Sequence, residues 1–415
     1  MKLGLRNIRL LLRTIGNPHH SFPSIHIAGT NGKGSTSCMI AAILTASDYR
    51  VGLYTSPHLV KFNERIRVNG VMISNADLVR HTDLLRTNVD AHHATFFEAT
   101  TAIAFKYFQE QKVDIAVIET GLGGRLDATN VLRPLVSVIT TIGKDHTQQL
   151  GKSLKSIAFE KGGIIKRGVP CVTGTTRPAA VRVLKEIAQH RHARFIHSLF
   201  YASIENVISE KTSQCFSLST PRIRLGSVRL PLLGDHQRHN VQTAVTVLEQ
   251  LERHGFRISG ENIQNGLSGI SQLTGIHGRL EILAESPLTI LDVAHNPDGI
   301  RKTVAVVQAL KFENLHLVFG VMKDKEYRAM IRLLSLLRPI VYAVQPKMER
   351  ALEVKEIVHI FSGCRCTALA YNSVHDGLNA AIEHSKKEDM VLITGSHYVA
   401  GDVLNAWRKK WRKSS

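Results

Sequence analysis

The chain has 415 residues, which is too long for one typical core and predicts two or three domains. Hydrophobic residues make up 43% of it, and no apolar run approaches the roughly 18 residues of a membrane-spanning helix, which argues against a membrane protein. The formal net charge of +19 favours anionic partners, whether nucleic acid, membrane surfaces or small molecules, without choosing among them.

The N-terminal stretch and the cysteines indicate a cytoplasmic protein. Arg6, Arg9 and Arg13 interrupt the apolar residues that a signal peptide would need. The five cysteines have neither a disulfide framework nor zinc-binding spacing, so we expect reduced thiols. Basic residues are spread along the chain except in the tail at 407–413, for which a solvated helix end is favoured over a site for RNA or anionic lipid.

The first part of the chain alternates apolar strands with helical stretches. In order, the expected elements are a strand at 25–27, a helix at 36–47, a strand at 51–54, a helix at 95–110, and strands at 114–118 and 135–139. A tight hairpin at 68–71 interrupts the pattern, and Ser74 or Asp77 begins the next helix. From 200 to 233 the pattern weakens into short alternations, and a helical run then ends near Arg253. The alternation predicts a parallel sheet covered on both faces.

Around residues 271–287 the periodicity lapses, and the alternation then restarts. The expected elements are strands at 288–291, 316–319, 340–344 and 390–393 and helices at 298–310, 324–337 and 350–361. The sequence therefore predicts an α/β protein with a P-loop-type parallel-sheet ATPase domain at 1–277 and a smaller doubly wound α/β domain at 278–415. Open α/β sheets bind ligands at the carboxyl ends of their strands, so we expect the site there, between the domains.

A glycine-rich loop with a lysine joins the first strand to the first helix of this pattern. Gly29, Gly32 and Gly34 let bare N–H groups approach a polyphosphate, Lys33 supplies a cation, and the helix N-terminus adds its positive end. The loop departs from the common form, because Gly34 separates Lys33 from Ser35. An incidental glycine-rich turn is the alternative. The residues expected to bind ATP, here called the phosphate loop, are Gly29, Thr30, Asn31, Gly32, Lys33, Gly34, Ser35 and Thr36.

Polar residues follow two further strands. Glu119 ends an apolar strand, and its carboxylate suits Mg²⁺, which prefers oxygen ligands; an ordinary solvated strand-end acid is the alternative. The turn 121–125 is rich in glycine, and its Arg125 is available to pair with a carboxylate or phosphate, although a plain turn reads equally well. His146 is as easily a structural histidine as a ligand, and Lys161 alone reads as a helix-terminal lysine.

Taken together, these motifs resemble the folylpolyglutamate synthase and dihydrofolate synthase family of the Mur ligase superfamily. The resemblance runs in order from about residue 1 to about residue 405. It rests on residues 29–35, 55–59, 119–130, 145–146, 160–161, 278–281 and 292–297. The sequence departs from the family at His397, where an apolar residue is usual.

The resemblance implies an ATP-dependent ligase that adds L-glutamate to dihydropteroate, to a reduced folate or to both. Such a ligase makes an acyl phosphate and releases ADP and phosphate. The implied metal site consists of Ser56, Glu119 and His146. It holds one or two Mg²⁺ ions and tolerates Mn²⁺, since imidazole suits softer ions. The implied substrate-binding residues are Pro57, His58, Arg125 and Asp127.

The resemblance also implies that Lys161 is carbamylated, which turns a cation into an anionic oxygen ligand. Lys33, Lys161 and His295 are the implied catalytic residues, and Arg279, Asp292 and His295 lie around the nucleotide. Ordinary helix capping by an asparagine before a proline, at 296–297, is the alternative for the last cluster. Glu98 is open among three roles: structural, supporting the metal, or facing substrate.

Two rival functions stay open. Another Mur-type amino-acid ligase would use a different acceptor, and a nucleic-acid-stimulated P-loop ATPase would fit the charge of +19 but would need an RNA-reading module, which we do not find. We expect a monomer that binds small molecules and neither nucleic acid nor membrane. The sequence does not choose between the two synthase activities, the preferred folate or the polyglutamate length.

Overall fold

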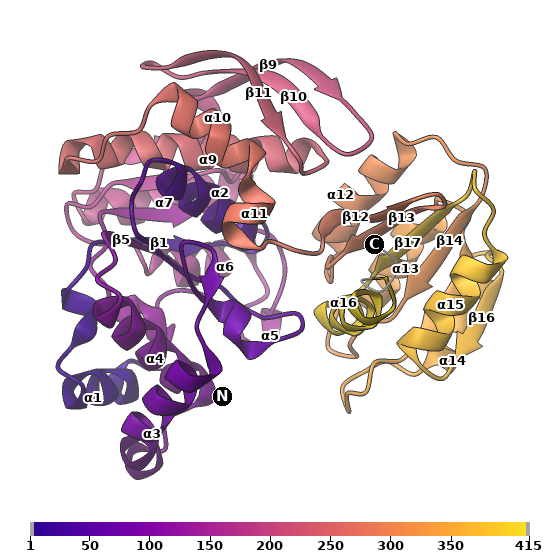
Figure 1. Cartoon of the computed structure of the whole chain (residues 1–415), viewed down its shortest axis with the longest axis horizontal. Helices are drawn as coiled ribbons and strands as arrows, with labels where there is room; N and C mark the ends of the chain where they lie inside the picture. Colours follow the sequence, from indigo (N-terminus) through magenta and orange to yellow (C-terminus); the bar gives the residue numbers. More distant parts are fainter. Residues whose placement is uncertain (1–3, 412–415) are drawn as a thin grey trace. The chain divides into compact units, whose positions relative to one another are not determined.

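A computed structural model of the chain describes residues 4–411, with side chains up to residue 407 (Figure 1). The basic tail after residue 407 therefore lies outside the described side chains. Two compact units make up the chain. The first comprises Met1–His58, Phe62–Pro231 and Asp235–Ile276, and the second comprises Leu59–Lys61, Leu232–Gly234 and His277–Ser415. The two short segments belong to the second unit because Leu59, Val60 and Leu233 pack into its hydrophobic clusters.

An eight-stranded sheet forms the middle of the first unit, in the order β4-β3-β2-β5-β1-β6-β7-β8. The strands are β1 (Ser24–Ala28), β2 (Val51–Tyr54), β3 (Ile66–Val68), β4 (Val71–Met72), β5 (Ile115–Glu119), β6 (Val136–Ile139), β7 (Cys171–Thr173) and β8 (Phe195–His197). From β2 to β8 the strands are parallel, and β3 and β4 add an antiparallel hairpin at one edge. That hairpin is the predicted one: Asn69 and Gly70 have φ of 46° and 77°, as primed two-residue turns require.

Helices cover the sheet of the first unit. They are α1 (Arg6–Thr14), α2 (Lys33–Ala46), α3 (Asn75–His92), α4 (Phe96–Glu110), α5 (Thr147–Leu150), α6 (Leu154–Gly162), α7 (Pro178–His190), α8 (Ser198–Tyr201), α9 (Asp235–Leu251), α10 (Gly260–Ser268) and α11 (Ile270–Thr274). Ala116 and Ile118 of β5 share a core with α1 and α4, and Ala28 and Ile139 share another with α6 and α7. Helix α2 packs on β1, β2 and β5, and α9 on β6 and β7. All five residues of β5 are buried, as expected for a sheet covered on both faces.

The weak alternation at 200–233 forms a separate three-stranded antiparallel sheet. Its strands are β9 (Ser203–Ser209), β10 (Gln214–Ser219) and β11 (Arg224–Leu230), with β10 in the middle. It packs against α9 and α10 (Figure 1). The buried carboxylate of Glu249 in α9 accepts hydrogen bonds from Tyr201, just before β9, and Thr220, just after β10, which ties that end of the small sheet to the helix.

A six-stranded sheet organises the second unit, in the order β12-β13-β17-β14-β15-β16. The strands are β12 (Arg279–Glu285), β13 (Leu288–Asp292), β14 (Leu315–Phe319), β15 (Ile340–Val344), β16 (Ala368–Tyr371) and β17 (Met390–Thr394). All neighbours are parallel except β12 and β13. The stretch 271–287, where the periodicity lapses, contains most of α11 and the strand β12, which the sequence analysis did not identify. β12 is half-buried and its pairing register shifts twice, so its side chains do not alternate regularly.

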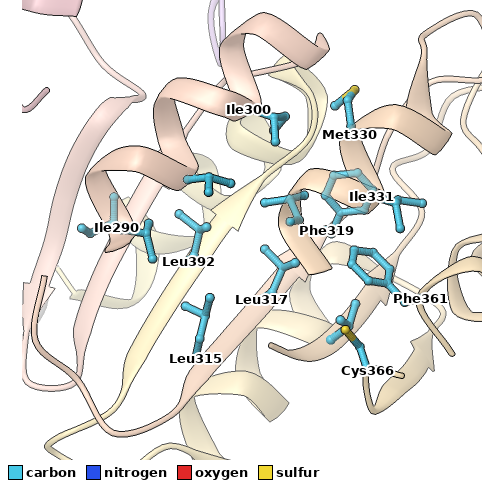
Figure 2. Close-up of a cluster of buried hydrophobic side chains, with 14 of the residues drawn as sticks. Ile290, Ile300, Leu315, Leu317, Phe319, Met330, Ile331, Phe361, Cys366 and Leu392 are labelled. Carbon is cyan, nitrogen blue, oxygen red and sulfur yellow. The ribbon is translucent and has the colours of Figure 1, made fainter. Parts of the chain in front are cut away.

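Helices cover both faces of the second sheet. They are α12 (Pro297–Gln308), α13 (Tyr327–Ser335), α14 (Val354–Gly363), α15 (Val374–His384) and α16 (His397–Trp411). Leu315, Leu317 and Phe319 of β14 point toward α12, α13 and α14 (Figure 2), whereas Val318 packs with α15 and α16. The predicted α/β fold, with a large parallel-sheet unit and a smaller α/β unit, is confirmed. None of the helices in the described part of the chain is long and apolar enough to cross a bilayer.

Candidate active site

Four loops meet at one edge of the first sheet. They follow β2, β5, β1 and β6, which are neighbours in that order, and the carboxyl ends of neighbouring parallel strands lie side by side. Ser56 follows β2, Glu119 is the last residue of β5, the phosphate loop follows β1, and Thr140 and Thr141 follow β6. The sheet order therefore brings together residues from four separate parts of the sequence.

Two glycines of the phosphate loop lie where no side chain fits. A side-chain carbon on Gly29 would lie 1.9 Å from Thr140 Oγ1, and one on Gly32 would lie 2.6 Å from Asn240 Oδ1. Both residues also have positive φ, 156° and 85°. Glycine is thus required here for steric and conformational reasons together.

The rest of the phosphate loop is held by the loop after β6. The N–H of Thr30 donates to Thr141 O at 2.7 Å, and the N–H of Asn31 donates to Thr141 Oγ1 at 3.1 Å. Helix α2 then begins at Lys33, earlier than the expected residue 36, and no side chain caps its N-terminus. The Thr36 hydroxyl in its first turn is buried without a hydrogen-bond partner in the described chain. An uncapped helix N-terminus with a glycine-rich approach is suited to binding an anion.

Two lysines meet at one carbonyl of the phosphate loop. Lys33 Nζ lies 3.2 Å from Gly29 O, and Lys161 Nζ, at the end of α6, donates to the same oxygen at 2.8 Å. Burial and, next, the charge of Lys33 lower the pKa of Lys161 to about 7, against the opposing effect of nearby carboxylates. A lysine with such a pKa is largely uncharged above neutral pH, and its amine is then nucleophilic.

Glu119 offers oxygens beside the phosphate loop. Its side chain is buried; Oε1 lies 3.9 Å from Lys33 Nζ, and Oε2 accepts from the N–H of Ser56 at 3.2 Å. Ser56 and Glu119 are thus adjacent through the Ser56 backbone, and a carboxylate oxygen is a ligand that suits Mg²⁺. His146 is the N-cap residue of α5, with Nε2 3.9 Å from Asp145 Oδ1. Residues 4–407 contain no cluster of three or more His, Cys, Asp or Glu side chains able to hold a metal.

Asp127 is bonded within its own loop. Its buried carboxylate accepts from the N–H of Leu122 at 2.8 Å and from both the N–H and the hydroxyl of Thr129. His26 Nε2 lies 2.8 Å from the same hydroxyl, which places Asp127 at the end of a chain of polar contacts that starts in β1. Burial raises the pKa of Asp127. A role for it in substrate binding stays a prediction.

Arg125 also has a partner on the protein. Its guanidinium forms a two-pronged ion pair with Glu160, with the shortest bond 2.9 Å long, and lies over the ring of Phe159. The Arg125 side chain is 46% exposed, so it remains accessible from solvent. Its expected contact with substrate stays a prediction.

The loop after β2 carries Pro57 and His58. His58 Nδ1 accepts from Arg65 Nε at 2.9 Å, and burial followed by the charge of Arg65 lowers the pKa of His58. Arg65 also lies over the rings of Phe62 and Phe96, 5.9 and 5.5 Å from their centroids. The sequence analysis did not identify this aromatic and cationic cluster. His58, Phe62 and Arg65 lie near one another in the sequence, but Phe96 is distant, so a local pattern does not join it to them.

Glu98 lies at the N-terminus of α4. Glu98 Oε2 accepts from both the N–H and the hydroxyl of Thr95, at 2.7 and 2.8 Å, and Thr95 Oγ1 accepts in return from the N–H of Glu98. This is a capping box at the N-terminus of α4. Glu98 therefore has a structural contact, and its role toward metal or substrate stays a prediction.

In the second unit, Arg279, Asp292 and His295 lie close to one another. Arg279 begins β12 opposite Asp292, which ends β13, and burial raises the pKa of Asp292. His295 Nδ1 donates to Val293 O at 3.0 Å, and the ring of His397 lies 4.6 Å from that of His295. The helix cap considered as the alternative for this cluster is present: Asn296 Oδ1 accepts from Gly299 N, and Pro297 begins α12.

The sequence analysis also did not identify two amide side chains near the phosphate loop. Asn240, whose Oδ1 faces Gly32, donates from Nδ2 to Gln237 Oε1 at 2.9 Å, and both side chains are buried. Gln237 and Asn240 stand three residues apart in the early turns of α9, so they share one helix face. Because α9 also carries other buried amides, Gln242 and Gln250, the sequence alone gives no signal that separates this pair.

The family models match most of the chain. The Mur ligase middle domain matches residues 27–248, and the Mur ligase glutamate ligase domain matches residues 278–397. The phosphate loop and Glu119 fall in the first match, and Arg279, Asp292 and His295 in the second.

Curated relatives and solved structures are similar over nearly the whole length. The dihydrofolate synthase/folylpolyglutamate synthase of Bacillus subtilis is 37% identical, over 97% of this chain and 94% of its own. The folylpolyglutamate synthase of Lacticaseibacillus casei is 34% identical, over 96% and 93%. Escherichia coli FolC in complex with DHPP and ADP superposes with a TM-score of 0.89 at 29% identity, covering 100% of this chain and 95% of its own. Mycobacterium tuberculosis folylpolyglutamate synthase complexed with ADP and AMPPCP gives 0.90 at 30% identity, covering 97% and 95%.

Proposed function

Because the chain belongs to the dihydrofolate synthase/folylpolyglutamate synthase family of Mur ligases, we propose that it is an ATP-dependent ligase that joins L-glutamate to dihydropteroate, to a reduced folate, or to both. One observation carries the proposal on the structural side. Lys33 is the first residue of α2, whose N-terminus has no side-chain cap, and its Nζ lies 3.9 Å from Oε1 of the buried Glu119. A cation and an oxygen ligand therefore lie beside a helix N-terminus suited to polyphosphate.

The reaction begins when a carboxylate oxygen of the acceptor attacks the γ-phosphorus of ATP, which gives an acyl phosphate and ADP. The amine of glutamate then attacks the acyl carbon, the amide forms, and phosphate leaves. Both steps concentrate negative charge, so catalysis depends on cations and positioned N–H donors. Lys33 and the N-terminal amides of α2 would bind the phosphates, since the loop is held rigidly by Thr141.

We assign Glu119 and Ser56 as the residues that hold Mg²⁺. When bound, the ion neutralises phosphate charge and helps orient the transferring group. Glu119 Oε2 already accepts a hydrogen bond from the backbone of Ser56, which fixes the carboxylate plane. The part of His146 in the metal site, the presence of a second ion and the tolerance of Mn²⁺ stay predictions.

Lys161 is proposed to act as a carbamate. Its amine adds to the carbon of CO₂ and loses a proton, which leaves an anionic group on the nitrogen. Two features support this: the pKa is lowered to about 7, so the nucleophilic form exists at neutral pH, and Lys33 and Lys161 lie on the same carbonyl. Two adjacent cations repel each other, whereas a carbamate beside Lys33 would be attracted to it.

The remaining roles stay predictions. Pro57, His58, Arg125 and Asp127 are expected to bind the acceptor, and the second unit is expected to bind the nucleotide and to contribute the catalytic His295. A cytoplasmic monomer that binds neither nucleic acid nor membrane is likewise expected.

An omission assay tests the proposal. ADP formation is measured with ATP and Mg²⁺ while the acceptor and L-glutamate are left out in turn, because phosphoryl transfer needs the acceptor and turnover needs the amine. We expect sustained ADP release only when both are present. ADP release that is stimulated by RNA and independent of glutamate would instead support the P-loop ATPase, and ADP release with another acceptor would support a different Mur-type ligase.

A further inference from the structure

The Asn130 side chain contacts three residues in two separate chain segments. The residue lies in the 3₁₀ turn Ala128–Val131 and is buried. Its Nδ2 donates to Arg125 O at 2.9 Å and to Gly163 O at 3.1 Å, and its Oδ1 accepts from Lys166 Nζ at 2.7 Å. Both N–H bonds of the amide are used, and its oxygen holds a cation. A buried amide so fully bonded joins the loop after β5 to the end of α6.

The two segments that Asn130 joins touch backbone to backbone. A side-chain carbon on Gly163 would lie 2.4 Å from Arg125 Cα, and one on Gly124 would lie 2.7 Å from Lys161 O. The N–H of Arg125 also donates to Glu160 O at 2.7 Å. With no side chains between the loop and the helix, a small displacement of one displaces the other.

The helix end fixed in this way carries Lys161. Lys161 precedes Gly163 by two residues, and its Nζ donates to Gly29 O of the phosphate loop at 2.8 Å. Hydrogen bonds weaken steeply once donor and acceptor separate beyond about 3.2 Å. Displacement of the end of α6 by a few tenths of an ångström would therefore loosen the contact between Lys161 and the phosphate loop.

The ion pair beside this contact is a weaker tie. The side chains of Arg125 and Glu160 are 46% and 21% exposed, and pairs open to solvent contribute on the order of 0–1 kcal/mol. Removal of a donor from a buried amide instead leaves two carbonyls without their partner. Among the side-chain contacts between the two segments, the buried amide is therefore a stronger tie than the ion pair.

We infer that Asn130 is a positioning residue for the ligase reaction proposed above: its amide ties the loop that follows Glu119 to the end of α6 and so places Lys161 against the phosphate loop. The inference rests on the proposed function for its effect on turnover. Its structural part, the placement of Lys161, can be measured without any substrate.

The Asn130→Asp variant tests this inference, because it keeps the shape and the oxygen that accepts from Lys166 but removes both donors. We expect kcat to fall by at least about tenfold, since misplacement of a catalytic group by about 1 Å can cost on the order of a hundredfold. The KM values for ATP and acceptor should change little. Asn262→Asp is the matched control. Asn262 Nδ2 donates to Ala46 O at 2.7 Å, at the far end of α2, and an aspartate there still accepts from Ser259 N.

A second variant acts on the same contact without touching the amide. Gly163 has a φ of −61°, which alanine adopts readily, so Gly163→Ala adds only a steric wedge against Arg125. We expect the same loss of kcat. This variant keeps the inference testable if Asn130→Asp does not fold.

Crystal structures of the variants decide the structural part. We expect the hydrogen bond from Lys161 Nζ to Gly29 O to be lost in Asn130→Asp and Gly163→Ala and kept in Asn262→Asp. If the bond persists in the first two, or if their kcat matches that of Asn262→Asp, the inference is overturned. A wild-type protein that forms no glutamyl amide would refute the ligase function, while the crystal structures would still decide whether Asn130 places Lys161.

Discussion

Replacement of Lys161 by methionine is expected to stabilise the folded chain at neutral and mildly acidic pH while it abolishes turnover. The Lys161 side chain is buried, and its pKa is lowered from the ordinary 10.5 to about 7, so the folded protein holds an ammonium group there at a cost whenever the pH is below that value. Methionine has a similar length and helix propensity and carries no charge. The variant therefore removes both the free-energy cost of the buried ammonium group and the amine that would form the carbamate.

The size of the expected stabilisation follows from the lowered pKa of Lys161. A difference of about 3.5 pKa units at 1.36 kcal/mol per unit sets an upper bound of roughly 5 kcal/mol on the cost of the buried charge. Loss of the hydrogen bond to Gly29 O offsets about 1 kcal/mol, and Lys33 Nζ still donates to that oxygen. A net gain of roughly 2–4 kcal/mol in the free energy of unfolding is expected at pH 6.

The gain has a defined pH dependence. Between pH 7 and 10.5 the unfolded chain binds a proton that folded Lys161 has released, so the stability of the wild type rises with pH and the advantage of methionine shrinks. Urea unfolding from pH 6 to 9, without nucleotide, metal or CO₂, measures both curves, with the exposed Lys152→Met as control. A Lys161→Met variant that is less stable than wild type throughout, or a difference that does not change with pH, would refute the reasoning.

Three further predictions concern the same edge of the sheet. Lys33→Ala and Glu119→Ala should each lower turnover by about a hundredfold or more with little change in thermal midpoint, and a near wild-type rate in a steady-state assay would remove that residue from the site. Lys161→Ala should lose activity and regain part of it when a small carboxylate is added, whereas Lys161→Arg should stay inactive; full activity of the arginine variant would exclude the carbamate. Asp127→Asn should lower the free energy of unfolding by about 1–3 kcal/mol, because an amide donor would then face another donor, such as the N–H of Leu122; unchanged urea denaturation would contradict that role.

Features that depend on neighbouring residues were readable from the sequence. The phosphate loop can be identified from the sequence because strand, glycines, lysine and helix follow one another directly. The same holds for the hairpin at Asn69 and Gly70, and for the caps at Ser74 and Asn296, whose bonds close within three residues.

Features that depend on distant residues were not readable. Asn240 lies against Gly32, and Lys161 contacts Gly29, but these contacts can be predicted only when the fold is known. The sequence showed that Arg125 could pair with an anion but not that Glu160 would be its partner. Strand β12 escaped detection for another reason: its two register shifts interrupt the period-two alternation on which strand assignment depends.

The identity of the product tests the central claim most directly. Purified protein is incubated with ATP, Mg²⁺ and L-glutamate, with dihydropteroate in one reaction and tetrahydrofolate in another, and the products are identified by mass spectrometry. The account predicts ADP in equal amount to an acceptor that has gained one glutamyl residue in amide linkage, in at least one of the two reactions. ATP hydrolysis with neither acceptor modified would contradict it.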